Sequence, residues 1–312
     1  MLFRSGLHNL KAHHHGCVAT IGNFDGVHLG HQHVLGELAE KAEEMKLPAV
    51  VITFEPQPQE FFIPDRCPGR LTRFREKIKA LRRLAVDRVF TLHFSQKLAA
   101  MEPEDFIQQV LVDGLGVRYL VVGDDFRFGQ KRRGSFEMLQ QAGQEHGFQV
   151  VNMHTFQLAG ERVSSTLIRQ SLKEGDLDHA EILLGRPYRM CGRVAHGHKR
   201  GRQIGFPTAN IHLHRKVSPI EGVFAVEMFG VEGEPVSGVA NVGTRPTVNG
   251  TRTVLEVHLL NFERDIYGSH VSVDFLKKIR NEQKFDSFEL LKEQILIDAT
   301  QARDYFTARY AM

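Results

Sequence analysis

Two histidines, His28 and His31, stand in the segment TIGNFDGVHLGHQ, where an apolar run gives way to a helical pattern. The first turn of a helix leaves backbone N–H groups unpaired and carries a partial positive charge, which makes it a site for phosphate. Glycines in the preceding turn let the backbone approach a ligand closely. Both imidazoles and several backbone amides are therefore expected to converge on one anionic group.

A second candidate segment is RVSSTLIRQSLKEGD, which begins a helical pattern with Ser164, Ser165 and Thr166. Their hydroxyls can cap the helix that follows, and capping alone is one interpretation. The other interpretation adds phosphate contacts from the hydroxyls and from Arg169 at the helix start. The residues leave both open.

The segment HGHKRGRQIGFPTAN is dense in glycine and basic residues. Gly197, Gly201 and Gly205 can lay backbone N–H groups against phosphates, with Lys199 among the residues that supply counter-charge. The segment is not a Walker A loop, because GxxxxGK[ST] is absent. It predicts a second, different phosphate-binding loop.

Thr208 and Asn210 alternate around Ala209, so both side chains point to one side of an extended segment. Two neutral oxygens side by side suit Mg²⁺, which takes few protein ligands and keeps water and phosphate for the rest. A polar turn with a Thr–Asn hydrogen bond is the alternative.

Glu256 lies inside the strand-like run TVLEVHLL. A carboxylate in such a strand is unusual unless it is paired or functional. Near a hydroxyl substrate it could act as a general base. The alternatives are an outward-facing strand residue or a partner for His258.

The first half of the chain alternates short apolar runs with helical patterns. We predict strands at Cys17–Ile21, Ala49–Phe54, Arg88–Leu92, Tyr119–Val122 and Gln149–Met153. We predict helices at His31–Lys46, Arg73–Leu84, Pro103–Leu111 and Phe136–Glu145. Continuous apolar strands separated by helices predict a doubly wound α/β domain, which binds its ligand at the carboxyl ends of its strands. TIGNFDG and VVGDDFRFG both follow strands and belong at that edge.

In the second half of the chain, apolar and polar residues alternate within short segments instead of forming continuous apolar runs. About six strands separated by turn residues are enough for a small closed barrel. They are expected near Arg189–Ala195, Ala209–Leu213, Gly222–Phe229, Val236–Val242, Thr253–Leu260 and Val271–Lys277. A final helix begins at about Ser287, with an apolar stripe for the barrel at Phe288, Leu291, Ile295, Ala299, Ala302 and Phe306. Gly185 and Pro187 mark the boundary between domains 1–185 and 186–312.

The composition limits the classes of protein to which the chain can belong. The chain has 312 residues, 42% hydrophobic and 25% charged, typical of a globular protein with about two domains. No apolar run approaches a membrane span and no signal-type segment opens the chain, so a cytoplasmic protein without a membrane partner is expected. The net charge of +3 calls for no nucleic acid. The three cysteines form no metal or disulfide pattern, so reduced thiols are expected.

Taken together, these motifs resemble the bacterial bifunctional riboflavin kinase/FMN adenylyltransferase (FAD synthetase) family. The resemblance covers nearly the whole chain and adds GDDFRFG, GVANVGTRPT and LEVHLLNFERDIYG to the segments above. It implies an N-terminal Rossmann-like nucleotidyltransferase domain and a C-terminal six-stranded antiparallel, riboflavin kinase-like barrel with a terminal helix. It also implies two ATP-dependent reactions that need Mg²⁺: riboflavin to FMN in the barrel, and FMN to FAD with release of pyrophosphate in the first domain. The expected partners are flavins and ATP, and a monomer with transient self-association is one possibility for assembly.

The resemblance also assigns roles to residues. In the adenylyltransferase, His28 and His31 stabilise charge on the ATP phosphates, and further ATP contacts come from Gly22, Asn23, Phe24, Asp25, Gly30, Ser164, Thr166 and Arg169. The flavin wall includes Asp125, Phe126 and Phe128. In the kinase, the phosphate loop contains Gly197, Lys199, Gly201 and Gly205. There, Glu256 accepts the hydroxyl proton, Thr208 and Asn210 hold Mg²⁺, and Arg280 helps enclose the flavin.

This chain departs from the family pattern at two positions. Asp125 replaces an asparagine found in many relatives and lacks the amide donor. Gln57 in FEPQP replaces a histidine, so no catalytic role is assigned to it.

Two rival functions remain from the sequence: a single-activity nucleotidyltransferase with an inert barrel, and a non-catalytic flavin or nucleotide binder. The motif set from GFPTAN to Glu256 argues against the first rival. The complete set of predicted catalytic residues argues against the second.

Overall fold

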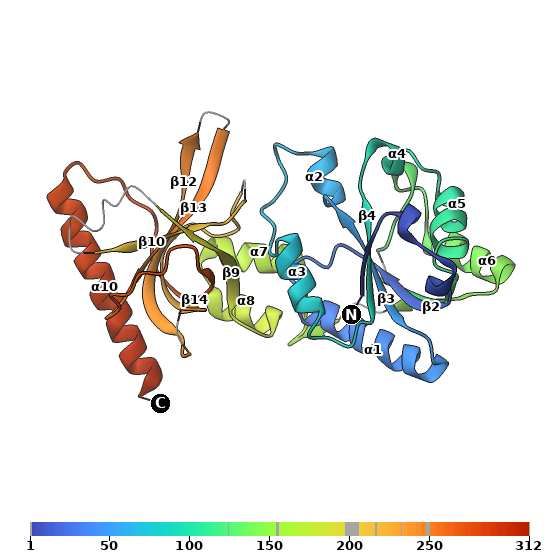
Figure 1. Cartoon of the computed structure of the whole chain (residues 1–312), viewed down its shortest axis with the longest axis horizontal. Coiled ribbons are helices and arrows are strands. Elements are labelled where there is room, and N and C mark those ends of the chain that lie inside the picture. The colour runs from blue at the N-terminus through green and yellow to red at the C-terminus, as the bar shows by residue number, and fades with distance from the viewer. Residues whose placement is uncertain are drawn as a thin grey trace. The chain divides into compact units, whose positions relative to one another are not determined.

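The computed structural model describes residues 2–123, 125–153, 156–196, 206–215, 217–231, 233–247 and 250–311. Its contacts divide the chain into two compact units (Figure 1). Unit 1 comprises Met1–Cys67 and Thr72–Ser164, and unit 2 comprises Pro68–Leu71 and Ser165–Met312. Helices α7 (Ser165–Glu174) and α8 (Leu177–Leu184) group with unit 2, because they pack on each other and α8 packs on strands of that unit. The predicted boundary at residue 185 separates the two expected activities, whereas the units described here are separated by their internal contacts. The boundary between the activities therefore stays a prediction.

Unit 1 is built on a six-stranded sheet in which every neighbouring pair is parallel. In chain order its strands are β1 (Leu2–Ser5), β2 (Cys17–Ile21), β3 (Ala49–Glu55), β4 (Arg88–His93), β5 (Val117–Gly123) and β6 (Gln149–Met153). Across the sheet the order is β1-β4-β3-β2-β5-β6. The chain runs outward from β2 through β3 on one side and through β5 on the other. The β2/β5 pair is therefore the switch point at which such sheets bind ligands.

Helices cover both faces of this sheet. Cys17, Ala19 and Ile21 of β2 lie in one core with residues of α5 (Pro103–Phe106), α6 (Phe136–His146) and the π-helical turns Ile107–Val112. Val18 lies in the opposite core, with α1 (Leu29–Met45) and α3 (Phe74–Leu81). The doubly wound prediction is confirmed, with β1 as an additional edge strand. The predicted helix Pro103–Leu111 changes to wider π turns after Phe106.

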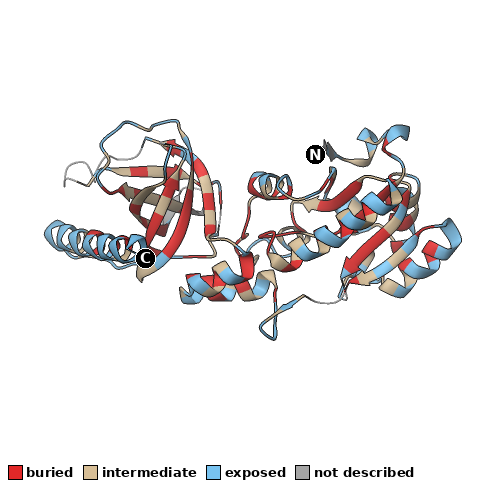
Figure 2. Ribbon diagram, turned by 90° about the horizontal axis from the view of Figure 1, so that it is seen from below, coloured by how far each residue is buried: buried red, intermediate tan, exposed pale blue. Residues whose placement is uncertain are grey.

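Unit 2 contains a closed barrel of antiparallel strands in the order β10-β13-β12-β11-β14-β9. The strands are β9 (Tyr188–Ala195), β10 (Thr208–His212), β11 (Gly222–Phe229), β12 (Val236–Thr247), β13 (Gly250–Leu259) and β14 (His270–Arg280). Figure 2 shows the buried residues of these strands in red. All six predicted strands are confirmed.

The terminal helix α10 (Phe288–Tyr310) begins after Ser287, whose Oγ accepts the backbone N–H of Leu290 at 3.2 Å. It forms a second core of unit 2 against the outer side of the barrel, in which Ala299, Ala302 and Phe306 contact Ala225, Leu260 and Leu276. The predicted stripe is correct for these three helix residues. It is wrong for Phe288, which is 48% exposed in the first turn. Leu291 and Ile295 are half-buried and do not belong to this core.

The remaining elements are short. They are α2 (Pro58–Phe62), α4 (Gln96–Ala99), the hairpin β7 (Gln157–Leu158) and β8 (Glu161–Arg162), and 3₁₀ turns at Leu7–Asn9, Ala12–His14 and Gln130–Arg132. Cys17, Cys67 and Cys191, all within the described residues, form no disulfide bond. Among the described residues, no helix has both the length and the apolarity to cross a membrane.

Candidate active sites

The loop between β2 and α1 has a strained backbone and a buried brace. Phe24 and Val27 have φ of 48° and 46°, a region that residues other than glycine seldom adopt. Asp25, 2% exposed, accepts hydrogen bonds at Oδ1 from N and Oγ1 of Thr72, at 2.9 and 3.1 Å. The N–H of Gly26 donates to the same hydroxyl at 2.9 Å. Asp25 therefore shapes the loop from inside, through contacts with Thr72.

The two histidines lie together at the start of α1. His28 is the N-cap residue, and its Nδ1 accepts the backbone N–H of His31 at 3.3 Å. The two rings stack, with centroids 3.6 Å apart and planes 18° from parallel. Nδ1 of His31 is buried without a hydrogen-bond partner in the described structure. Burial, followed by the charges of His28 and Lys77, holds the pKa of His31 well below its usual range. Near pH 7 this ring is therefore neutral.

Gly30 allows the segment that contains Ser164 to lie close to His28. A Cβ at this position would lie 3.2 Å from Nδ1 of His28 and 3.3 Å from the carbonyl oxygen of Val163. The absence of a side chain thus allows the segment before Ser164 to pack against the histidine turn. Ser164 belongs to unit 1, whereas Thr166 and Arg169 belong to unit 2.

Lys77 and Thr53 lie beside the histidine loop and were not identified in the sequence analysis. Lys77 of α3 and Thr53 of β3 are both 0% exposed, and Nζ donates to the threonine hydroxyl at 3.4 Å. Thr53 Oγ1 in turn donates to the carbonyl oxygen of Asn23 at 3.5 Å. The sequence did carry a signal for Lys77: it lies four residues before Leu81 and therefore on the apolar face of the predicted helix.

The loop after β5 carries the predicted flavin wall. Phe126 and Phe128 stack with centroids 5.7 Å apart, and both pack on the core of unit 1. Asp125 is exposed and pairs with Arg162 of β8 at 2.9 Å. Because β5 neighbours β2, this loop and the histidine turn follow the two strands of the switch point. The predicted common edge is confirmed.

The predicted kinase residues share the outer face of the barrel. Leu255 and Val257 are 0% exposed in the barrel core, so Glu256 between them points outward. Asn210 of β10 and Asn241 of β12 pair with Glu256 on either side. Thr208 pairs with His258 in the next outward row. Thr208 and Asn210 therefore lie on one side, as predicted, and Glu256 joins them there.

The alternative in which Glu256 is a partner for His258 is not favoured, because the His258 ring has other contacts. Its Nδ1 lies 3.0 Å from the carbonyl oxygen of Pro207, and its ring contacts Phe206 with centroids 5.0 Å apart. Burial lowers its pKa, more than the bond to Pro207 raises it. The predicted loop residues Gly197, Lys199, Gly201 and Gly205 lie outside the described residues.

Arg280 is held by an ion pair. Its Nε and Nη2 donate to the two carboxylate oxygens of Asp298, both at 2.8 Å, and the side chains are 17% and 4% exposed. Gln294 donates to the same carboxylate at 2.9 Å. The pair joins β14 to α10. A flavin contact by Arg280 stays a prediction, alongside this structural role.

Replacing Arg280 with methionine is expected to destabilise the protein by about 3–5 kcal/mol, since it strands a buried carboxylate. Urea unfolding measures this loss. The double variant Arg280→Met/Asp298→Leu removes both charges and should recover most of the stability. An unchanged unfolding midpoint with a raised KM for riboflavin would instead make Arg280 a flavin residue without a structural role.

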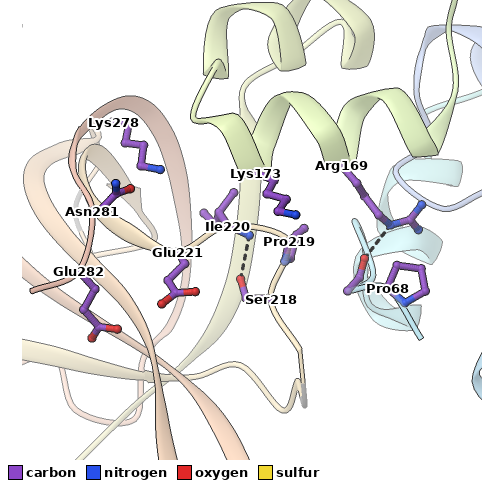
Figure 3. Close-up of a pocket in the computed structure, with 11 residues that line it drawn as sticks. Pro68, Arg169, Lys173, Ser218, Pro219, Ile220, Glu221, Lys278, Asn281 and Glu282 are labelled. Atoms are coloured by element: carbon purple, nitrogen blue, oxygen red, sulfur yellow. Dashed lines mark hydrogen bonds between the residues drawn. The ribbon is translucent and has the colours of Figure 1, made fainter. Parts of the chain in front are cut away.

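Arg169 lines a cavity of about 560 Å³ within unit 2 (Figure 3). Figure 3 shows Arg169 and Lys173 projecting from α7 toward the segments that carry Pro68 and Pro219. Arg169 donates through Nε to the carbonyl oxygen of Gly69 at 2.8 Å and through Nη1 to that of Ser165 at 3.1 Å. Its predicted contact with ATP phosphates stays a prediction.

Comparison with known proteins matches both halves. Residues 10–167 match the family model of FAD synthetase, and residues 184–306 that of riboflavin kinase. A bifunctional riboflavin kinase/FMN adenylyltransferase from Escherichia coli (strain K12) is 52% identical over 96% of each chain. The chain belongs to this family. Another member, from Haemophilus influenzae, is 52% identical over 97% of this chain and 98% of its own.

A solved structure shares the fold over nearly the full length. It is of a protein described as a macrolide-efflux protein from Streptococcus pneumoniae, with 30% identity and a TM-score of 0.81, and the match covers 96% of this chain and 97% of that one. The family resemblance inferred from the motifs is confirmed.

Proposed function

We propose that the two activities of this family use separate residue sets, one that includes His28 and His31 and one on the barrel. The chain is a riboflavin kinase and an FMN adenylyltransferase, and its substrates are ATP and flavins. The kinase phosphorylates the ribityl hydroxyl of riboflavin to give FMN. The adenylyltransferase then transfers AMP from a second ATP to FMN, giving FAD and pyrophosphate. One observation supports two separate sites. The stacked pair His28–His31 lies at the switch point of unit 1, whereas Glu256 lies on the outer face of the barrel in unit 2.

In the adenylyltransferase, His28 and His31 donate ring N–H groups to charge that develops on the α-phosphate and the leaving pyrophosphate. Pre-placed donors of this kind are the main catalytic resource for phosphoryl-type transfer. The N-terminus of α1 adds backbone donors at the same place. Further ATP contacts come from Gly22, Asn23, Phe24, Gly30, Ser164, Thr166 and Arg169, and Asp25 acts by shaping the loop. Phe126 and Phe128 offer ring faces to the flavin, beside Asp125.

In the kinase, Glu256 accepts the proton of the attacking ribityl hydroxyl. Thr208 and Asn210 are proposed to hold Mg²⁺, which when bound neutralises charge on the ATP phosphates. The donor set fits this ion, since two neutral side-chain oxygens and one carboxylate come from paired positions on the outer, half-buried face of the barrel. Gly197, Lys199, Gly201 and Gly205 are proposed to cover the phosphates.

A chromatographic time course tests the proposal. Purified protein is incubated with ATP and Mg²⁺, once with riboflavin and once with FMN. We expect FMN and then FAD from riboflavin, and FAD from FMN. FAD from FMN with no product from riboflavin would leave an inert barrel, and no conversion of either flavin by folded protein would leave a binding protein.

Replacing Asn210 with alanine is expected to raise the Mg²⁺ concentration that gives half-maximal FMN formation by about tenfold, since one of two protein ligands is lost. A Mg²⁺ titration of riboflavin phosphorylation measures it. FAD formation from FMN by the same variant is the internal control and should keep its Mg²⁺ dependence. An unaltered titration of the kinase step would remove Asn210 from the metal site.

A further inference from the structure

Lys77 is a charged side chain sealed inside unit 1. It is 0% exposed and among the largest fully buried side chains in the described structure. Lysine is almost never fully buried unless it is paired or functional. Its helix, α3, faces the core of unit 1 with Ile78 and Leu81, so Lys77 occupies a position where an apolar residue would cost less.

The ammonium group of Lys77 reaches the loop of the adenylyltransferase site through one intermediary. It donates to the hydroxyl of Thr53 at 3.4 Å, and that hydroxyl donates to the carbonyl oxygen of Asn23 at 3.5 Å. Thr53 lies near the carboxyl end of β3, next to β2 in the sheet. Asn23 directly precedes Phe24, where the backbone turns to positive φ.

The same short segment of chain braces the loop a second time. Thr72, just before α3, binds the Asp25 carboxylate through its backbone N–H and its hydroxyl, and accepts the N–H of Gly26. Residues 72–77 thus fix two points of the loop that leads to His28. A strained loop keeps its shape only where its surroundings impose it.

Lys77 also acts on the catalytic histidines through its charge. The titratable groups whose charges act on His31 are His28, stacked on it, and Lys77 of α3. After burial, the electrostatic interactions with His28 and then with Lys77 account for the lowered pKa of His31. A neutral His31 keeps one ring nitrogen as a donor without an added proton.

We propose that Lys77 is a positioning residue of the adenylyltransferase site, which sets the loop at residues 22–28 through Thr53 and disfavours a second positive charge beside itself on His31. This inference rests on the proposed adenylyltransferase role of the two histidines.

The test compares Lys77→Met with Lys79→Met, an exposed lysine on the same helix. We expect Lys77→Met to lower kcat/KM for FMN adenylylation roughly tenfold or more, since misplacing a reacting group by about 1 Å can cost up to about 100-fold. The pKa of His31, followed by NMR without substrates, should rise. The acid limb of the rate profile should then move to higher pH, because the neutral ring is the active form. Lys79→Met should change none of these.

A second pair of variants separates the hydrogen-bond relay from the charge. Thr53→Val removes the hydroxyl and should lower adenylylation while leaving the titration of His31 unaltered. Thr53→Ser keeps the hydroxyl and should stay close to wild type. Thermal unfolding of each full-length variant shows whether it is folded.

The proposal is overturned if folded Lys77→Met retains wild-type adenylylation, or if it loses activity while the His31 titration and the Thr53→Val variant stay normal. Wild-type protein that makes no FAD from FMN would refute the adenylyltransferase assignment instead. The His31 titration needs no turnover, so it still tests the placement of Lys77 in that case.

Discussion

Glu256→Gln is expected to lower the rate of FMN formation from riboflavin by about 10²- to 10⁴-fold, the usual contribution of a general base. The amide keeps the size of the side chain and its place between the paired Asn210 and Asn241, but it cannot accept the hydroxyl proton. The barrel should stay folded, because Glu256 lies outside its apolar core. Initial rates of riboflavin phosphorylation by the purified variant measure the effect.

Conversion of FMN to FAD by the same variant should remain close to wild type, since none of the residues proposed for that step lies on the barrel. Glu263→Gln, an exposed carboxylate after β13, is the matched control and should leave both steps unchanged. Equal loss of both steps in folded Glu256→Gln would contradict the proposal of two sites.

His28→Asn is expected to lower FAD synthesis from FMN by about 10²- to 10³-fold, comparable to the removal of one transition-state donor. Asparagine is a good N-cap residue, so α1 keeps the acceptor that His28 now supplies to the N–H of His31. The loss should therefore reflect the missing imidazole rather than a frayed helix. Steady-state kinetics with FMN and ATP measure it, and phosphorylation of riboflavin should be retained.

Two comparisons sharpen this result. His28→Ala should add a loss of about 1 kcal/mol in the free energy of unfolding, because the N-cap is gone as well. His33→Asn, an exposed histidine on the same helix, should change neither activity nor stability appreciably. Unaltered FAD synthesis by His28→Asn would remove His28 from the catalytic set.

Much of the fold could be read from the chain because the signals are local. The strands of unit 1 are continuous apolar runs, since helices cover both faces of the sheet, and each of the five predicted strands is present. The edge strand β1 and the two-residue strands β7 and β8 were not predicted, because segments so short carry no usable period. Phe288 fitted the stripe of α10 by spacing, yet only the later turns of the helix pack against the outer side of the barrel.

The site was predictable as a set of motifs but not as a geometry. The sequence by itself determined which residues are candidates for the chemistry, because helix starts, glycine turns and an isolated carboxylate have local signatures. Only the tertiary structure decided which of them meet. Closure of the barrel pairs β10 with β13 and so sets Asn210 beside Glu256. The packing of α3 on the sheet buries Lys77 near His31, and the docking of α10 gives Arg280 its partner Asp298. These are contacts between segments far apart in the chain, and their register is fixed by the packing of the whole unit rather than by any local pattern.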